Sequence, residues 1–428
     1  MAATNRRVVI TGIGVITPIG LNAASFWESL LAGRSGIKPF KAFDVSPLST
    51  HFAGEIQDFE PKNFIDKANR KSLRMMARAI QLAVAAAQLA MDDSKIDKAK
   101  LDPTRFGIEF GAGLLPTELA ELGTAAQLAI DSEPGHVDLQ AWGEKGIPAI
   151  PPLWMLKYLP NMLACHVSIL HNAQGPNNSI TEGDAGSILA LGEAYRIIRR
   201  DQADFFLVGG ADSKLNPLSV VRQEMFGHLS RRNDAPEKAS RPFDKNRDGM
   251  VIGEGGGVLV VEELEHARRR GASIYAEVVG VGSAFNRKGQ TTGLTRAARV
   301  ALQQAGTSSD DLDHVNAHGL STQKDDAREA AALEELVGSA GKPLSLWAGK
   351  SYFGNLGAGS GTTELAASLL ALKNGTVPAS LNCDDPDVPA SLEVNRINRP
   401  LTRPNVLKVS FNDMGQCAAV VCRKWTEN

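Results

Sequence analysis

Apolar and polar residues follow two recurring patterns along the chain. Near-continuous apolar runs, typical of buried parallel strands, occur at 8–16, 204–208, 276–281 and 314–317. The runs at 204–208 and 314–317 each lead to a glycine, which predicts a turn after the strand. Apolar residues at helical spacing predict helices over 74–91, 185–199, 295–304, 324–337 and 362–372. Strands and helices that alternate in this way are typical of an α/β layered fold.

Composition narrows the class of protein. A chain of 428 residues is long enough for a large core in two or three domains. Its net charge of −2 gives no reason to expect a nucleic acid partner. The apolar run at 80–90 is too short to span a bilayer, and the N-terminus does not resemble a secretory signal. The four cysteines lack metal-ligand spacing, so we expect reduced thiols, no metal and a cytoplasmic protein.

One segment carries a pattern linked to chemistry. Residues 175–190 read GPNNSITEGDAGSILA. The pattern predicts a short strand that ends near Thr181, a tight turn, and then a helix. This is the layout of a nucleophile elbow, which holds a side chain at a helix N-terminus facing a pocket. Asp184 occupies the elbow position, so the sequence predicts that its carboxylate faces a pocket.

The same segment resembles the active-site segment of the β-ketoacyl-acyl-carrier-protein synthases, closest to the synthase II type. Further similar segments are RRVVITGIGVITPIG at 6–20, SRPFDKNRDGMVIGEGGGVLVVEELEHARRRGASIYAEVVGVG at 240–282, VNAHGLST at 315–322 and GKSYFGNLGAGSGTTE at 349–364. The resemblance implies a thiolase fold, which is a five-layered αβαβα block of two similar halves. We expect an N-terminal half at 1–265 and a C-terminal half at 266–428.

The resemblance also implies which residues meet at the site. In the family, a cysteine nucleophile stands at the position of Asp184, one histidine at His318, and a second histidine at Asn355. Only one of these three residues keeps the family's type. The resemblance implies further roles as well. Lys350 and Glu364 are expected in a supporting charged network, and Asp326 as a scaffold carboxylate. Leu320 and Thr322 stand at the two pantetheine contacts, and Asp413 stands at the gate.

The sequence leaves the role of the altered residues open. Asp is among the best helix N-caps, so Asp184 is expected either to cap its helix or shape the pocket, or to act as an acid, base or electrostatic group. A helix N-terminus is expected to lower its pKa. Glu182 is a second candidate base, while His318 and Asn355 are either structural or bind a carbonyl oxygen. Cys417 is a further candidate, as a relocated nucleophile.

Two functions fit this pattern. The first is a ketosynthase-like protein that has lost condensing activity and pairs with an active ketosynthase, as chain-length factors do. The second is a thiolase-fold enzyme that acts on acyl-carrier or CoA thioesters without a cysteine intermediate. Both imply an acyl carrier protein or acyl-CoA as partner and no cofactor. The family pairs its subunits through the strand at Asn178–Thr181, so we expect a homodimer or a heterodimer. The stretch at 114–153 is the least family-like and is expected to influence the choice of partner or ligand.

Overall fold

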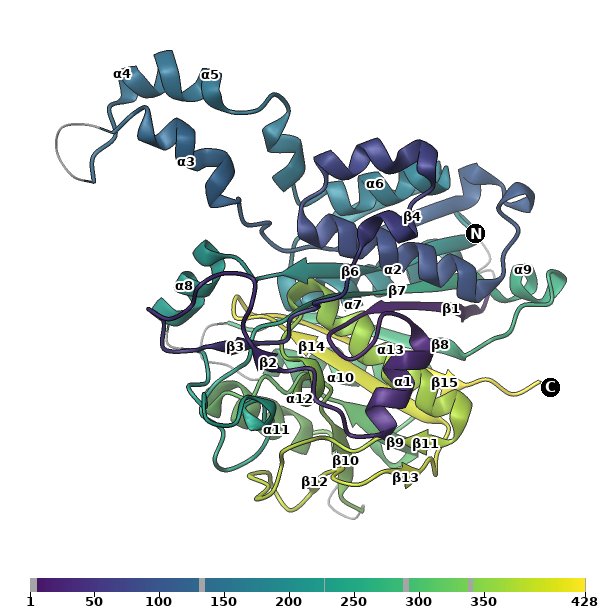
Figure 1. The fold of residues 1–428 in the computed structure, drawn as a ribbon. Coiled ribbons are helices and arrows are strands. Elements are labelled where there is room, and N and C mark those ends of the chain that lie inside the picture. The colour runs from purple at the N-terminus through teal and green to yellow at the C-terminus, as the bar shows by residue number, and fades with distance from the viewer. Residues whose placement is uncertain (1–5, 131–134, 227, 288–291, 338–341, 428) are drawn as a thin grey trace.

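The computed structural model describes residues 6–130, 135–226, 228–287, 292–337 and 342–427 (Figure 1). Within these ranges the strands are β1 Val8–Ile16, β2 Lys38–Pro39, β3 Phe52–Ala53, β4 Phe106–Gly111, β5 Asn177–Ile180, β6 Phe205–Ser213, β7 Glu254–Glu263, β8 Ala276–Phe285, β9 Leu312–Asn316, β10 Leu344–Trp347, β11 Thr376–Val377, β12 Leu392–Val394, β13 Arg399–Pro400, β14 Asn405–Phe411 and β15 Gln416–Lys424.

Helices connect most of these strands. The α-helices are α1 Ala23–Leu31, α2 Arg78–Ser94, α3 Leu119–Gln127, α4 Leu139–Ala141, α5 Ile147–Ala149, α6 Met162–His171, α7 Gly186–Arg199, α8 Pro217–Met225, α9 Leu264–Arg269, α10 Thr292–Ala305, α11 Gln323–Glu334, α12 Lys350–Phe353 and α13 Ser360–Asn374. Short helical turns are η1 Pro61–Phe64, η2 Lys67–Met75, η3 Lys98–Lys100, η4 Pro103–Arg105, η5 Trp142–Gly146, η6 Trp154–Tyr158, η7 Gly183–Ala185, η8 Pro236–Lys238, η9 Ser309–Asp311 and η10 Gly357–Gly359.

The main sheet repeats one set of pairings in each half of the chain. Its order is β12-β10-β9-β14-β15-β8-β1-β7-β6-β4-β5. In the first half, β1 pairs with β7 and β7 with β6 in antiparallel fashion, and β6 pairs with β4 and β4 with β5 in parallel fashion. In the second half, β8 pairs with β15 and β15 with β14 in antiparallel fashion, and β14 pairs with β9 and β9 with β10 in parallel fashion. The two sets meet where β1 pairs with β8 over three residues. A division at 265/266 falls within α9, between the two sets, and stays a prediction.

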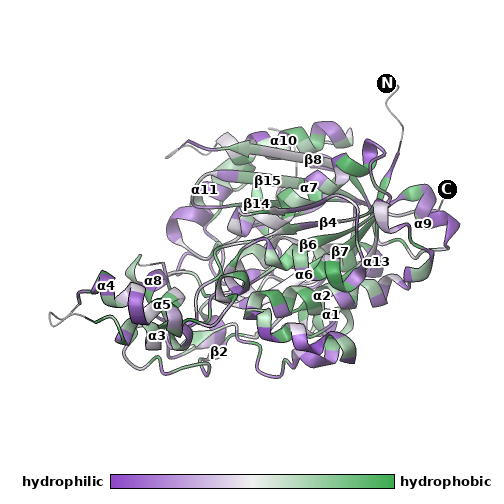
Figure 2. Cartoon of the chain, turned by 90° about the horizontal axis from the view of Figure 1, so that it is seen from above, coloured by the Kyte–Doolittle hydropathy of each residue, from purple (hydrophilic) through white to green (hydrophobic). Residues whose placement is uncertain are grey.

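Helices form three layers around these strands. The central layer is α7 and α13, which contact strands of both halves and each other. On one outer face α2 packs against β1, β6 and β7, and α6 packs against α2 and β4. On the other outer face α10 packs against β8, β14 and β15, and α11 packs against α10. Hydrophobic residues are concentrated in the central strands and their covering helices (Figure 2). The αβαβα order confirms the expected fold class.

Two details differ from the sequence-based expectation. The predicted turn after residue 208 is wrong, because β6 continues through Gly209 and Gly210 to Ser213. A Cβ at Gly209 would lie 2.2 Å from the carbonyl oxygen of Gly257, and one at Gly210 would lie 2.4 Å from that of Ala358. These glycines therefore permit close packing inside the strand rather than a turn. The helix predicted from residue 74 begins at Arg78, after the separate turn η2.

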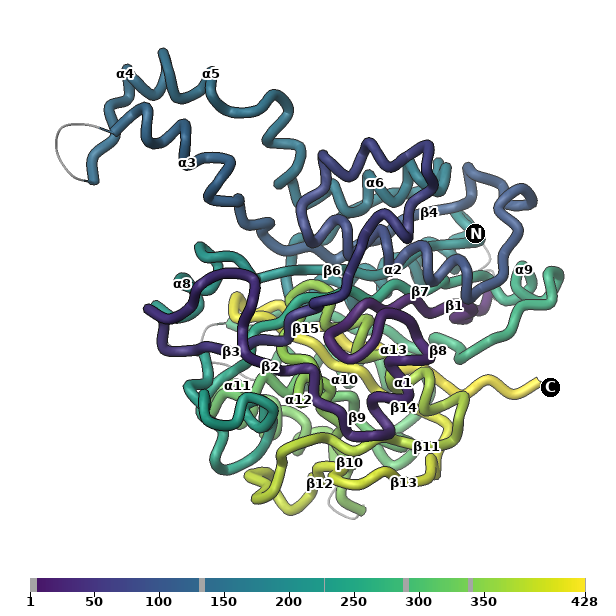
Figure 3. The backbone as a smooth tube through the Cα atoms, in the orientation of Figure 1, coloured from purple at the N-terminus to yellow at the C-terminus, as the bar shows by residue number. Residues whose placement is uncertain are grey.

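An arm projects from this layered body. It carries α3, α4, η5 and α5, and returns to the body through η6 (Figures 1 and 3). Large apolar side chains on it are exposed, among them Leu119 at 48%, Leu139 at 79%, Ile147 at 56% and Leu153 at 65%. The arm coincides with the stretch that least resembles the family. Among the described residues, no helix combines the length and the apolar character needed to cross a membrane.

Candidate active site

The chain turns sharply between β5 and α7, as the elbow pattern predicts. Gly183 has a left-handed φ of +49°, which favours glycine, and η7 then leads directly into α7. Asp184 lies inside η7, and its side chain makes no capping hydrogen bond to the helix. The prediction that Asp184 caps its helix is wrong. The helical turn begins one residue earlier, at Gly183, and the cap positions of η7 and α7 are held by Glu182 and Ala185.

Asp184 instead meets the two other residues predicted for the site. The Nδ2 of Asn355 donates a hydrogen bond of 2.9 Å to Oδ2 of Asp184. The Nε2 of His318 lies 3.7 Å from the same oxygen. His318 follows β9 and Asn355 follows α12, so three distant segments supply this cluster. The side chain of Asp184 is 21% exposed, whereas that of His318 is 2% exposed.

The protonation of His318 follows from its neighbours. The ammonium of Lys350 lies 3.2 Å from Nδ1 of His318 and also donates to the His318 carbonyl at 2.7 Å. Burial and the charges of Lys350 and Lys408 hold the pKa of His318 well below its usual value. The ring is therefore neutral. Because Nδ1 accepts from an ammonium, the single ring proton lies on Nε2 and faces Asp184. The ring of Phe411 packs 4.4 Å from the His318 ring, centre to centre.

A buried ionic network stands behind His318. Lys350 donates to Oε1 of Glu364 at 2.7 Å, as expected for this pair, and Lys408 donates to Oε2 of the same carboxylate. All three side chains are at most 1% exposed. Burial lowers the pKa of Lys408 to about 8. Sequence reasoning missed Lys408, although a lysine within the apolar strand NVLKVSF was a signal of a buried charge partner.

The expected pKa shift of Asp184 has the wrong sign. Burial raises the pKa of Asp184, while Lys350, Asn355 and Lys214 lower it by smaller amounts. Desolvation therefore outweighs the favourable field of the helix start. Lys214 was not predicted as a site residue. Its ammonium pairs with Asp212 at 2.9 Å, and the charges of both Asp212 and Asp184 raise the pKa of Lys214.

The turn after His318 is held by two buried carboxylates. Glu329 accepts from the backbone N–H groups of His318 and Gly319, at 2.6 and 2.8 Å. Asp326 accepts from the N–H groups of Ser321 at 3.0 Å and Phe243 at 2.8 Å. Burial raises the pKa of Asp326 to about 7. This geometry suits the scaffold role that the resemblance implies for Asp326, because both bonds hold backbone rather than a ligand.

The two expected pantetheine contacts lie on the same turn. The side-chain oxygen of Thr322 caps α11 by accepting from the N–H of Asp325 at 3.1 Å, and its hydroxyl donates to Oδ2 of Asp325 at 2.7 Å. The Thr322 hydroxyl is thus engaged locally. Leu320 is half-buried and packs against a small apolar cluster around Val220 and Met250. A role for either residue in binding a ligand stays a prediction.

The loop between β14 and β15 contacts the elbow through its polar residues. Asn412 donates to the carbonyl and the carboxylate of Glu182, at 3.1 and 2.9 Å. Glu182 therefore holds this loop. Asp413, expected at the gate, is exposed to solvent. Cys417 is fully buried in β15, and burial raises its pKa to about 12. A buried protonated thiol is a poor nucleophile, which argues against the relocated-nucleophile hypothesis.

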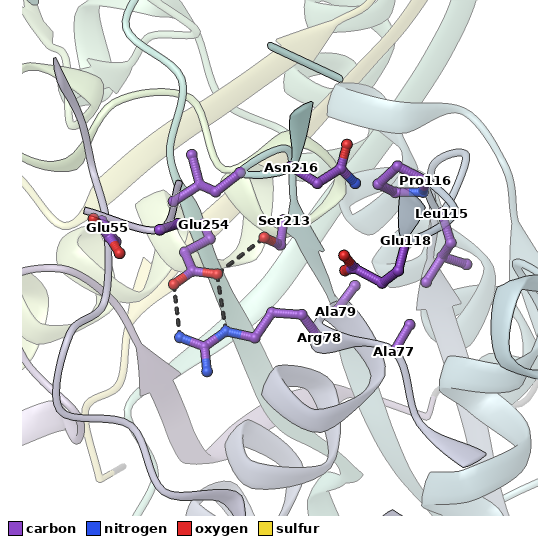
Figure 4. A pocket seen from close by; sticks show the side chains of 12 residues that line it. Glu55, Ala77, Arg78, Ala79, Leu115, Pro116, Glu118, Ser213, Asn216 and Glu254 are labelled. Carbon is purple, nitrogen blue, oxygen red and sulfur yellow. Dashed lines mark hydrogen bonds and ion pairs between the residues drawn. The ribbon is translucent and has the colours of Figure 1, made fainter. Parts of the chain in front are cut away.

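A separate recess lies where the arm leaves the body (Figure 4). It encloses about 260 Å³, and none of the predicted site residues lines it. The guanidinium of Arg78 points at Glu254 and binds it through two hydrogen bonds of 2.7 and 3.0 Å, and Ser213 donates a third at 2.9 Å. Two of the charged residues that line the recess, Arg78 and Glu254, are thus paired with each other. Among the described residues, no cluster of histidine, cysteine and acidic side chains is suited to hold a metal ion.

Comparison with known proteins accounts for this arrangement. A family profile described as "Beta-ketoacyl synthase, N-terminal domain" matches residues 5–267, and one described as "Beta-ketoacyl synthase, C-terminal domain" matches residues 275–384. The chain belongs to the β-ketoacyl synthase family. It is 35% identical to a 3-oxoacyl-(acyl-carrier-protein) synthase 2 of Coxiella burnetii, covering 97% of this chain and 98% of the relative. It is 34% identical to a synthase 2 of Vibrio harveyi, covering 99% of this chain and all of the relative.

Solved ketosynthase structures share the whole fold. The ishigamide ketosynthase/chain length factor superimposes with a TM-score of 0.86 at 29% identity, over 98% of this chain and 100% of that chain. A ketosynthase bound to a hexaketide, in complex with its type II PKS acyl-carrier protein, gives 0.84 at 27% identity, over the same shares of the two chains. Family members of this kind act in fatty acid or polyketide synthesis together with an acyl carrier protein.

Proposed function

We propose that this protein is a ketosynthase-family subunit without condensing activity, which pairs with an active ketosynthase in the manner of a chain-length factor. The observation that carries the proposal is the carboxylate at the elbow. The resemblance puts Asp184 where the family has its nucleophile, and the proposal is supported by its contacts: Oδ2 accepts from Asn355 and lies 3.7 Å from Nε2 of His318. An acyl group attached to a carboxylate would form a mixed anhydride that water destroys, so Asp184 cannot store an acyl chain as a thiolate does.

The cysteines support this reading. Cys383, Cys417 and Cys422 are buried, and burial raises the pKa of each to about 12. Cys165 is half-buried on α6, which packs on the outer face of the sheet. None of the four contacts the cluster of Asp184, His318 and Asn355 in any interaction described for the chain. No thiol therefore takes part in the contacts described for this site, which supports a protein that works without a cysteine nucleophile.

The direct test combines partner capture with mass spectrometry. The protein should co-purify with an intact ketosynthase from the same gene neighbourhood, and this complex should elongate acyl-carrier thioesters. Alone, the protein should show no acyl adduct by intact mass after incubation with an acyl-carrier thioester. An adduct on the isolated protein, or carbon–carbon bond formation by it, would contradict the proposal.

One observation favours an alternative, an enzyme acting on acyl-carrier or CoA thioesters without a covalent intermediate. The raised pKa of Asp184 beside a neutral histidine suits general acid or base chemistry. In that case Asp184→Asn should lower turnover about 100-fold, the scale of a lost general base. For a non-condensing subunit the same variant should leave the turnover of the reconstituted complex nearly unchanged. Turnover of the complex, measured with both forms, separates the two functions.

A further inference from the structure

The amide of Asn355 is oriented as a donor by bonds on its other side. Its Oδ1 accepts from the N–H of Gly357 at 3.2 Å and from the hydroxyl of Ser360 at 2.9 Å. The backbone N–H of Gly357 can only donate, so the side-chain atom that it contacts is the acceptor Oδ1, and the Ser360 hydroxyl donates to the same oxygen. The NH₂ group of Asn355 therefore faces the elbow whether or not a carboxylate stands there.

The ring of His318 is oriented in the same way from behind. Lys350 bonds to Nδ1 and to the carbonyl of His318, and Glu364 holds Lys350 from the opposite side. Lys408 occupies the second oxygen of Glu364, so this carboxylate cannot turn toward the histidine. The neutral ring thus presents Nε2–H to the elbow. Two fixed N–H donors from different segments converge on one point.

The atom at that point belongs to the protein itself. Oδ2 of Asp184 lies 2.9 Å from Nδ2 of Asn355 and 3.7 Å from Nε2 of His318. The ammonium groups of Lys350 and Lys214 favour a negative charge at this point, and Asp212, the ion-pair partner of Lys214, opposes it. Converging N–H donors with a nearby cation form a typical site for a carboxylate oxygen or for a carbonyl oxygen that gains negative charge. We infer that Asp184 is an internal occupant of a two-donor anion site, where its Oδ2 takes the place of a ligand's carboxylate or thioester carbonyl oxygen.

This inference rests on the proposed loss of condensing activity and explains how the loss is enforced. A ligand oxygen can reach the two donors only if the Asp184 carboxylate leaves. A ligand that carries a carboxylate would also be repelled by the charge of Asp184. The site is therefore blocked by occupation and by charge, while its donors remain in place.

Replacing Asp184 by a smaller residue should open the site to an external anion of matching size. Asp184→Ala removes a carboxylate, which formate replaces, and Asp184→Gly removes an acetate-sized group, which acetate replaces. Titration with ¹³C-labelled formate, followed by NMR line broadening, should show saturable binding to Asp184→Ala. The Kd of Asp184→Ala for formate should be at least about tenfold lower than the Kd of the unmodified protein, a difference of about 1.4 kcal/mol. Acetate should bind Asp184→Gly in the same way.

The double variant Asp184→Ala/Asn355→Leu lacks one donor and should bind formate no better than the unmodified protein. Asp413→Ala removes an exposed carboxylate and should likewise leave formate binding unchanged. Equal formate binding by the unmodified protein and Asp184→Ala, or by the single and double variants, would overturn the inference. Asp184→Ser provides a polar small residue if the alanine variant does not fold. Formate binding needs no partner and no turnover, so condensing activity of the unmodified protein would contradict the proposed function alone.

Discussion

At position 184, burial and neighbouring charges act in opposite directions on one carboxyl group. Burial raises the pKa of Asp184, and the pull of Lys350, Asn355 and Lys214 does not offset it. The folded protein therefore holds the proton of Asp184 more tightly than the unfolded chain does. Ionisation of this group disfavours the folded state, so its contribution to stability falls as the pH rises from the unfolded pKa through the folded pKa.

Asp184→Asn should accordingly raise the free energy of unfolding at pH 7. The amide keeps an oxygen that can accept from Asn355 and never ionises, so the variant avoids the cost of ionising a buried group and should unfold at a higher urea concentration. The gain should shrink as the pH falls toward 4, where Asp184 is increasingly protonated in both states. Urea unfolding of the unmodified protein and of Asp184→Asn, at pH 7 and at pH 5, measures the gain at each pH. A loss of stability at pH 7 would show that the ionised form is favoured after all.

The thiols should differ sharply in reactivity. Cys383, Cys417 and Cys422 are buried, with their pKa raised to about 12, whereas Cys165 is partly exposed. Iodoacetamide at pH 7.5 should therefore modify the native protein at Cys165, and modify all four cysteines after denaturation. Peptide mass mapping gives the sites. Rapid labelling of Cys417 in the native protein would revive it as a nucleophile.

At the scale of elements, a buried carboxyl group lies next to the edge of the sheet. Glu109 lies on β4, opposite Asn178 of the edge strand β5. It is 1% exposed, and its Oε2 makes no hydrogen bond within the described part of the chain. Burial, with a smaller effect of Glu193, raises the pKa of Glu109 to about 8. A buried acid next to an open edge makes the stability of this part of the sheet dependent on pH.

The free energy of unfolding should therefore fall as the pH rises from 5 to 8. Over this range the unfolded chain holds Glu109 ionised at little cost, whereas the folded protein must ionise it in a buried position. We expect a loss of about 2–4 kcal/mol from this group, less than its full pKa shift implies because the edge relaxes. Glu109→Gln should remove that part of the pH dependence, while Glu118→Gln, at an exposed position, should leave it unchanged. Chemical denaturation of the three proteins at pH 5, 6.5 and 8 tests this. Parallel curves for all three would contradict it.

At the scale of the whole molecule, β5 and the arm form the part of the surface suited to a partner. β5 ends the order of the main sheet, and its outer side has no strand beside it among the described residues. The carbonyls of Pro176 and Ile180 point to β4, so the backbone of Ser179 points outward, where its N–H bonds to the side chain of Asn178 at 2.9 Å. Exposed apolar residues on the arm add area that a stable interface would bury.

We expect a dimer, with itself or with a ketosynthase, formed by pairing along β5. Ser179→Pro removes the outward N–H without breaking the ladder to β4, because proline is tolerated on the outer side of an edge strand. It should weaken the dimer at least about tenfold, a loss of about 1.4 kcal/mol, and leave the circular dichroism spectrum unchanged. Ser179→Ala keeps the N–H and should dimerise normally. Analytical ultracentrifugation measures both, and an unaffected dimer would exclude β5 as the interface.

The sequence by itself determined the architecture and the membership of the site. Apolar runs and helical spacing predicted β1 and the central helices α7 and α13, because burial of whole elements leaves a local pattern in the chain. The resemblance of three motifs to those of the ketosynthases implied that Asp184, His318 and Asn355 lie together, and in the structure they do. These are properties that each segment carries within a few residues, or within a motif whose residues are continuous in sequence.

Tertiary structure alone decided the chemical state of those residues. The direction of the Asp184 pKa, the Nε2 proton of His318 and the inertness of Cys417 depend on burial and on charges supplied by distant segments. Lys408 lies 90 positions from His318, yet it completes the network behind that ring. Desolvation and distance are set by how layers pack together, and no local pattern records them. For that reason the sequence suggested a helix cap at Asp184, whereas in the structure its carboxylate accepts a hydrogen bond from Asn355 and lies 3.7 Å from Nε2 of His318.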